Sequence, residues 1–236
     1  MTFDLKLLDF EEYEAQTTEE GRTYNINGRL LPSITTVLGK TKSDSSKKAL
    51  DNWSDRLAKE GKDANVVKQA AADRGSAMHE LAEKYVRGNP NYAKGYSGET
   101  LRLFKQIQFE LDYNIDEIYA IESTLFSNKL RMAGRVDMVA RNKRNNKTCI
   151  VDFKTSTKMK RESWIEDYKL QTTAYAIMMM EMKNILVKDY IIIIAAEDSV
   201  SAQVFAGPIE PYIKPLLNKR DQYEKLCNSR QLNSVA

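Results

Sequence analysis

Residues 133–155 read AGRVDMVARNKRNNKTCIVDFKT, two apolar runs separated by a polar turn. The runs 133–140 and 148–155 have the length and alternation of strands, and the turn between them predicts a β-hairpin. If the hairpin is symmetric about residues 144 and 145, Asp137 lies opposite Asp152. Lys154 points to the same side as Asp152, because side chains alternate along a strand. The stretch therefore predicts two carboxylates and one amine on the same face of a strand pair.

Two facing carboxylates require a neutralising partner. Opposed residues place their Cβ atoms about 4.5–5.5 Å apart, and like charges that close disfavour ionisation of both groups. An ordinary surface ion pair with Lys154, worth about 0–1 kcal/mol, is one solution. However, YIIIIAA (190–196) is apolar on both faces, so we expect a sheet that is covered on both sides. In a partly buried cleft, the two carboxylates favour a hard divalent cation, Mg²⁺ or Mn²⁺.

The only histidine of the chain, His79, lies in RGSAMHELAEKY (74–85). Four neighbours recur at helical spacing and predict a core-facing stripe: Met78, Leu81, Ala82 and Tyr85. His79 lies on the flank of this stripe, and a half-buried histidine is the simpler interpretation of this stretch alone. A metal ligand becomes the better interpretation if the helix flanks the sheet and brings His79 beside Asp137 and Asp152.

The remaining pattern predicts an α/β fold, a mixed central sheet flanked by helices. We expect helices at 49–61, 64–88, 99–112, 163–183 and 209–229, and strands at 118–126, 133–140, 148–155, 188–197 and 201–206. Asn27-Gly28 predicts a hairpin turn. Ser33 stands where a helix N-cap is expected, and Gly39 where that helix is expected to stop.

Composition excludes several classes of protein. The two cysteines fit a reduced cytosolic protein and are too few for a four-cysteine zinc or iron–sulfur site. Residues 1–16 have neither a secretory nor a mitochondrial targeting pattern, and the longest apolar run is far too short to cross a membrane. We therefore expect a cytoplasmic protein without a membrane partner.

The distribution of charge is more informative than the net charge of +3. Between Arg141 and Arg161 there are eight basic residues and one acid, Asp152. A run of charge is usually a solvated face, but this one brackets the expected cation site. It therefore favours an anionic polymer as substrate. Gln171 and Tyr175 follow on the next helix, four residues apart on one face; alone they are the polar edge of a packed helix.

The order of His79, GRVD (134–137), VDFKT (151–155) and QTTAY (171–175) resembles the RecB-like branch of the PD-(D/E)XK nuclease superfamily. The stretch LPSITTVLGKT (31–41), with Trp53 and the RGSAMHE helix, is similar to the phage and mitochondrial genome maintenance exonucleases of that branch. The resemblance implies a restriction-endonuclease-like core. It also implies two parts: an N-terminal lead with a helical cover over the cleft (1–65), and the nuclease core (66–236).

The resemblance also implies roles for residues. The metal ligands are expected to be His79, Asp137, Asp152 and the main-chain carbonyl of Phe153. Lys154 is expected to position the attacking water. Asp137 and Asp152 join it as catalytic residues, and Gln171 and Tyr175 support the site and the DNA. Relatives with an iron–sulfur cluster carry four cysteines around this core, so no such cluster is expected.

Further candidates have weaker support. Glu122 stands where relatives often have an acid on the preceding strand, but its own strand pairing places it near Gly134. The candidate DNA contacts are Ser33, Thr35, Thr36, Arg74, Arg135, Thr155 and Lys158. For the first three, a helix cap and helix-start packing account for the residues equally well.

These features predict a metal-dependent deoxyribonuclease. The most specific expectation is an exonuclease that acts on single-stranded or end-bearing DNA, in phage-type DNA replication, repair, recombination or degradation. The expected partner is DNA, single-stranded with a free end. Two alternatives stay open: a recombination nuclease acting on duplex DNA ends, and a DNA-binding subunit whose nuclease core is silent. The sequence chooses neither between Mg²⁺ and Mn²⁺ nor among oligomeric states.

Overall fold

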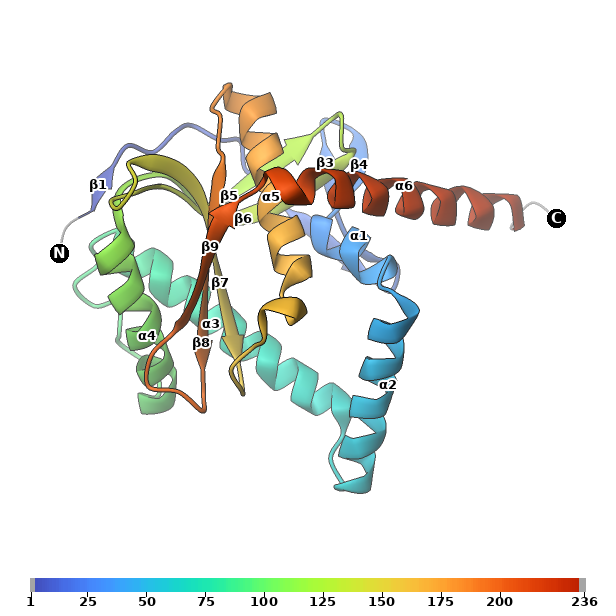
Figure 1. The fold of residues 1–236 in the computed structure, drawn as a ribbon, viewed down its shortest axis with the longest axis horizontal. Helices are drawn as coiled ribbons and strands as arrows, with labels where there is room; N and C mark the ends of the chain where they lie inside the picture. Colours follow the sequence, from blue (N-terminus) through green and yellow to red (C-terminus); the bar gives the residue numbers. More distant parts are fainter. Residues whose placement is uncertain (1–2, 234–236) are drawn as a thin grey trace.

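The predicted hairpin lies at the centre of a six-stranded mixed sheet with helices on both faces, as Figure 1 shows for the computed structural model. The structure describes residues 3–233, so the outermost residues of the two expected parts, 1–2 and 234–236, lie outside it. The strands, in sheet order, are β1 (Asp4–Leu5), β5 (Ile115–Ser127), β6 (Met132–Asn142), β7 (Lys147–Ser156), β8 (Asp189–Ala196) and β9 (Gln203–Pro208). The expected fold class is confirmed.

The register of the central hairpin is the predicted one. Met138 pairs with Val151, and the pairing continues through Asn142 and Lys147 to the turn. The next opposed positions are therefore Asp137 and Asp152. The neighbouring pairs are antiparallel except for two: β1 is parallel to β5, and β7 is parallel to β8. The β7–β8 pair needs a crossover connection, which a helix supplies.

Helices cover both faces of the sheet, because both faces are apolar. On one face, α3 (Ala64–Val86) and α4 (Gly98–Asn114) pack against a layer that includes Met138, Val151 and Ile193. On the other face lies α5 (Glu166–Lys183), the crossover helix, which follows the short η1 (Glu162–Trp164). Behind α5 lie α1 (Ile34–Lys40) and α6 (Glu210–Asn233). Because α5 is enclosed by the sheet and by these helices, its residues are buried almost all round.

A small second sheet lies beside β6. It consists of β2 (Ala15–Thr18), β3 (Gly21–Ile26) and β4 (Arg29–Pro32). The predicted turn between β3 and β4 is confirmed: Asn27 and Gly28 both have positive φ, 50° and 85°, as a two-residue hairpin requires. Tyr24 packs with Ile26 against Ala133 of β6, which joins the two sheets.

The helix after this sheet begins as predicted and ends differently. The hydroxyl of Ser33 accepts a hydrogen bond from the backbone N–H of Thr36 at 3.0 Å, so the predicted N-cap is confirmed. The predicted stop at Gly39 is wrong. The helix continues through Lys40, and its cap is Thr41, whose hydroxyl donates to the carbonyl of Val37 at 2.8 Å. That side-chain bond satisfies a terminal carbonyl without a glycine.

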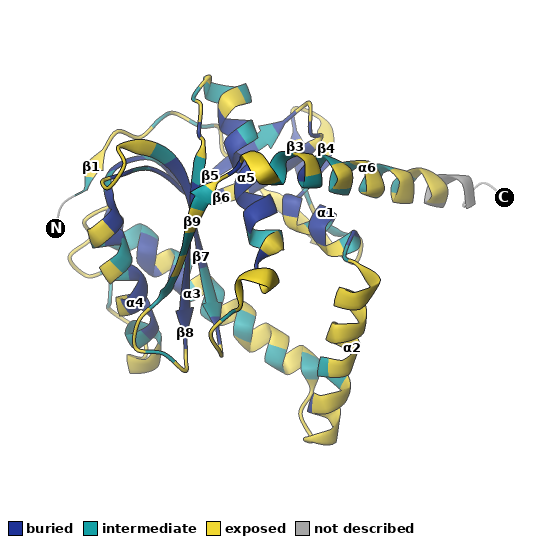
Figure 2. Cartoon of the chain, viewed as in Figure 1, coloured by how far each residue is buried: buried dark blue, intermediate teal, exposed yellow. Residues whose placement is uncertain are grey.

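The helix α2 (Asp44–Lys59) and the start of α3 project from the body and meet at their far ends (Figure 1). Figure 2 shows their surfaces as mostly exposed. Leu57 is the one buried residue of α2, and the buried residues of α3 begin only at Met78. Among the described residues, no helix is both long and apolar enough to span a membrane.

Candidate active site

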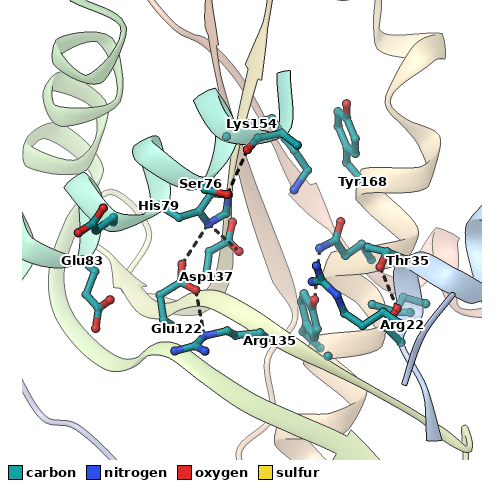
Figure 3. A pocket seen from close by; sticks show the side chains of 18 of the residues that line it. Arg22, Thr35, Ser76, His79, Glu83, Glu122, Arg135, Asp137, Lys154 and Tyr168 are labelled. Atoms are coloured by element: carbon teal, nitrogen blue, oxygen red, sulfur yellow. Dashed lines mark hydrogen bonds and ion pairs between the residues drawn. The ribbon is translucent and has the colours of Figure 1, made fainter. Parts of the chain in front are cut away.

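Segments that are far apart in the sequence meet around one cavity of about 680 Å³ (Figure 3). Its walls come from α1, α3, α5, the small sheet and strands β5 to β7 of the central sheet. Six of the sequence candidates discussed above for catalysis, metal binding or their support line it: His79, Glu122, Asp137, Lys154, Gln171 and Tyr175. The cavity is therefore the place where the expected chemistry is brought together.

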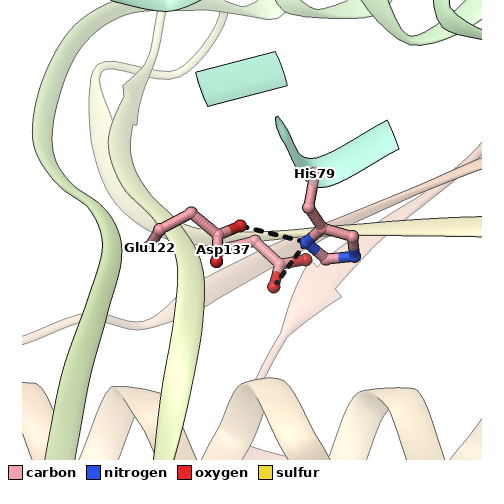
Figure 4. A group of neighbouring side chains, drawn as sticks. All are labelled: His79, Glu122 and Asp137. Carbon is pink, nitrogen blue, oxygen red and sulfur yellow. Dashed lines mark hydrogen bonds and ion pairs between the residues drawn. The ribbon is translucent and has the colours of Figure 1, made fainter. Parts of the chain in front are cut away.

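Three of these side chains form a tight cluster (Figure 4). The Nδ1 atom of His79 lies 3.0 Å from Oε1 of Glu122 and 3.4 Å from Oδ1 of Asp137. One donor atom from each residue lies within 4.8 Å of the other two. The residue Glu122, which had the weakest sequence support, is thus in contact with His79.

The expected position of Glu122 near Gly134 is wrong. The partner of Gly134 is Leu125, and the neighbours of Glu122 on either side, Ile121 and Ser123, pair with Met138 and Val136. Glu122 therefore lies level with Asp137. Two local features explain why counting residues along regular strands misplaces Glu122. The pairing of β5 is irregular between residues 115 and 120, and Glu122 itself has φ +47°. A positive φ is uncommon for a non-glycine residue and is often found at functional sites.

The buried Asp152 and the half-buried Lys154 form a pair beside the cluster. The Nζ atom of Lys154 donates to Oδ1 of Asp152 at 2.5 Å, and Asp152 is only 1% exposed. The other carboxylate oxygen, Oδ2, is buried without a hydrogen-bond partner. An orphaned carboxylate oxygen is costly unless a cation or a proton satisfies it. The ammonium of Lys154 also lies 5.1 Å from the ring centre of Tyr168 on α5.

The hairpin itself holds Asp137 in place. The backbone N–H of Phe153 donates to Oδ2 of Asp137 at 2.7 Å. This bond leaves Oδ1 facing His79. The backbone of β7 thus fixes the carboxylate on β6, and the role expected for the carbonyl of Phe153 stays a prediction.

The pKa values show how strongly these charges interact. Burial alone would lower the pKa of His79, but the negative charges of Asp137 and Glu122 outweigh it and raise that pKa to about 9. Burial raises the pKa of Asp152 to about 6, although Lys154 opposes the shift. Burial also raises the pKa of Asp137. The carboxylates are therefore costly to ionise in the absence of additional positive charge.

The donor set fits a divalent cation. Two carboxylates and an imidazole suit Mn²⁺, and carboxylates with water suit Mg²⁺. His79, Glu122 and Asp137 supply donors close enough to share one ion, and the unpartnered oxygen of Asp152 supplies another.

Gln171 and Tyr175 support the cavity from α5. Gln171 Nε2 donates to the hydroxyl of Tyr175 at 3.2 Å. The ring of Tyr175 lies directly on Gly134: a Cβ atom at that position would be 2.8 Å from Cε1 of Tyr175. The glycine of the GRVD stretch thus makes room for the tyrosine of the QTTAY stretch.

The candidate DNA contacts are distributed unevenly. Ser33, Thr35 and Arg135 line the cavity. Thr36 instead forms hydrogen bonds with the backbone of Arg22.

The other candidate DNA contacts lie away from the cavity lining. Arg74 pairs with Glu197 at 2.5 Å and contacts the Thr155 hydroxyl at 3.4 Å. Lys158 is exposed on the connection between β7 and α5.

Sequence reasoning missed several lining residues, among them Ser76, Glu80 and Glu83 of α3 and two residues of the small sheet. Arg22 and Tyr24 of β3 reach the cavity from the small sheet. Alternation along RTYNI places both on one face of that strand, but nothing in the sequence shows that this sheet docks beside the central one. The sequence therefore predicts that the two side chains point to the same side of the strand, but not that this side faces the cavity.

A nuclease family model matches part of the chain. Residues 97–204 match the family model described as PD-(D/E)XK nuclease superfamily. No curated protein matches the chain. Among solved structures, the chain is similar to a protein from Eubacterium rectale described as "Putative exonuclease", with 10% identity, a TM-score of 0.39, and coverage of 65% of this chain and 68% of that one. The matched residues, which make up less than half of the chain, include Asp137, Asp152 and Lys154.

Proposed function

We propose that the chain is a divalent-metal-dependent exodeoxyribonuclease of the RecB-like branch, acting on single-stranded DNA with a free end. The observation that carries the proposal is that the pair of Asp152 and Lys154 lies beside the cluster of His79, Glu122 and Asp137. This arrangement and the family match over residues 97–204 both support nuclease chemistry. The finer statements, exonuclease and single-stranded DNA, rest on the features below.

Each residue has a distinct part in the proposed reaction. His79, Asp137 and Asp152, together with Glu122, would hold the cation, which would supply positive charge against the charge that develops on the phosphate. Lys154 is held by Asp152 and by the ring of Tyr168, so its ammonium has a fixed direction from which to orient the attacking water.

The approach to the cavity suits a nucleic-acid strand. The connection between β7 and α5 carries the exposed Lys158 and Arg161. The guanidinium of Arg161 lies 5.3 Å from the ring centre of Trp164, which is 60% exposed. An exposed aromatic ring beside basic side chains is the usual platform for an unpaired base. We further propose that α1, α2 and the start of α3 form the cover over the cleft, under which a strand with a free end would pass.

Digestion of labelled DNA tests the proposal. The purified chain is given the same sequence as linear single strand, closed-circular single strand and linear duplex, with Mg²⁺ or Mn²⁺. We expect degradation of the linear single strand and resistance of the circle. Faster cleavage of the duplex ends would favour the recombination nuclease, and cleavage of the circle at the same rate would reject an exonuclease.

Two substitutions test the assignment of the site. Asp152→Asn and Lys154→Met should each lower the cleavage rate by about a hundredfold or more while the fold persists in circular dichroism. Lys147→Met, on the same strand but at its exposed start, is the matched control and should retain activity. Full activity in either site variant would reject the assignment, and DNA binding without cleavage in any metal would favour the silent subunit.

A further inference from the structure

A second hollow, of about 450 Å³, adjoins the active-site cavity. Arg22, Tyr24 and Arg135 line both spaces. The two arginines therefore stand at the boundary between the cation site and the second hollow. In Figure 3 they lie on the side of the cavity away from Lys154.

Arg135 is tied directly to the expected cation site. Its Nε atom lies 3.2 Å from Oε2 of Glu122, while the other oxygen of Glu122 contacts His79. Arg22 is on the neighbouring small sheet, where its positive charge opposes the rise that burial causes in the pKa of Tyr24. A phosphate that leaves the cation site in this direction would therefore meet two guanidinium groups and a phenol.

The far wall of the second hollow has the opposite charge. It is formed by the segment before β2, which presents the exposed carboxylates of Glu12 and Glu14. A strand that continued past the arginines would bring its next phosphates towards these carboxylates, where like charges repel. A strand that ended at the arginines would avoid that repulsion.

We propose that Arg22 and Arg135, with the hydroxyl of Tyr24, form a subsite for the terminal phosphate of a nucleic-acid strand, and that Glu12 and Glu14 stop the strand there. The inference rests on the proposed function and deepens it, because it gives the free end a binding site of its own. Arginine matches phosphate with paired hydrogen bonds. A terminal phosphate monoester carries about −1.5 to −2 charges, more than an internal diester, so two arginines favour the end over the middle of a chain.

Binding measured in EDTA tests the subsite without any cleavage. The probes are single-stranded 12-mers of one sequence with hydroxyl ends, a 5′-phosphate or a 3′-phosphate, each labelled at the opposite end. We expect one of the two phosphates to tighten binding by about tenfold. Arg22→Gln should abolish this gain and Arg22→Lys should restore part of it. Arg144→Gln, on the exposed β6–β7 turn, is the matched control and should preserve it.

The acidic wall is tested separately. The double variant Glu12→Gln/Glu14→Gln should bind closed-circular single-stranded DNA more tightly than the wild-type chain does, because a DNA strand that continues past the arginines no longer meets two carboxylates. The preference, which is the ratio of the affinities for linear and circular single strands, should therefore become smaller. Glu19→Gln, in the exposed turn between β2 and β3, is the control and should leave the preference unchanged. An unchanged preference in the double variant would remove the wall from the proposal.

The outcomes separate this inference from the proposed function. Equal binding of all three 12-mers by the wild-type chain, or an end-phosphate gain that survives in Arg22→Gln, would overturn the subsite even if the chain cleaves DNA. Displacement of the phosphorylated 12-mer by inorganic phosphate at equal concentration would show that free phosphate is the ligand and would also overturn it. A gain lost only in Arg22→Gln supports the subsite even if no DNA is cleaved.

Discussion

The imidazole of His79 lies 3.0 Å from the carboxylate of Glu122, and this contact joins the helix that flanks the sheet to an irregular strand of the sheet. We expect Glu122→Gln to weaken Mn²⁺ binding by about tenfold to a hundredfold, since an amide keeps the shape of the side chain and loses its charge. Isothermal titration calorimetry measures the affinity, and cleavage assays measure the accompanying loss of activity.

Glu83→Gln is the matched control for this change. Glu83 lies on α3 and lines the same cavity, but it is outside the cluster that could share an ion. It should bind Mn²⁺ as the wild-type chain does. Unchanged affinity in Glu122→Gln, or an equal loss in both variants, would remove Glu122 from the proposed ligands.

The close packing of Gly134 and Tyr175 gives a second prediction. A methyl group at residue 134 would lie 2.8 Å from the Tyr175 ring and 3.3 Å from Ile34, so the ring, which supports the cavity, must move. We expect Gly134→Ala to lower the free energy of unfolding by about 1–3 kcal/mol and to lower cleavage as well. Urea denaturation measures the first effect.

Gly39→Ala provides the contrast. Gly39 lies inside α1, and a Cβ there would meet no atom within 4 Å. Because alanine favours a helix over glycine, this variant should gain up to about 1 kcal/mol. If both glycine variants behaved alike, the contact between Gly134 and Tyr175 would not explain the difference.

The buried thiol of Cys149 predicts a loss of stability at alkaline pH. Burial, with a smaller contribution from the charge of Asp189, raises the pKa of Cys149 to about 12, whereas in the unfolded chain it is about 8.5. Between these values the folded state keeps a proton that the unfolded state has lost. The free energy of unfolding should therefore fall as pH rises above about 8.5, by at most about 1.4 kcal/mol per pH unit from this group.

Urea denaturation from pH 8 to pH 10 measures this slope. Cys149→Ala lacks the thiol, so its stability relative to the wild-type chain should improve as pH rises. Cys227→Ala, which removes the half-exposed cysteine, should follow the wild-type slope. Parallel curves for the wild-type chain and Cys149→Ala would contradict the assigned pKa.

The sequence predicts the central hairpin well because its signals are local. The polar turn and the alternation of side chains set the register that brings Asp137 level with Asp152. The position of Glu122 was not predictable in this way. It depends on the irregular pairing of β5 and on a left-handed backbone conformation at Glu122 itself. The pattern of apolar and polar residues predicts neither feature.

The second hollow shows a different limit. Arg22 reaches the cavity only because the small sheet packs on β6 through Tyr24 and Ala133. Docking between two sheets depends on the shapes of both surfaces, which no short motif records. For this reason, the residues contributed by β5, β6 and β7 could be proposed from the sequence, whereas those contributed by β3 could not.

The projecting helix α2 should be the most dynamic helix of the chain in its free state. Only Leu57 of this helix is buried, so few apolar contacts oppose local opening. Hydrogen exchange followed by mass spectrometry should show fast exchange over residues 44–59 and slow exchange in α4, which packs on the sheet.

If α2 covers the bound strand as proposed, linear single-stranded DNA should slow exchange in α2 and in residues 64–77 of α3. The Lys154→Met variant in Mg²⁺ keeps the DNA intact during this measurement, and closed-circular DNA is the control, because a strand without an end cannot pass under a closed cover. Exchange in α2 that is as slow as in α4, or equal protection by linear and circular DNA, would contradict a cover that admits only free ends.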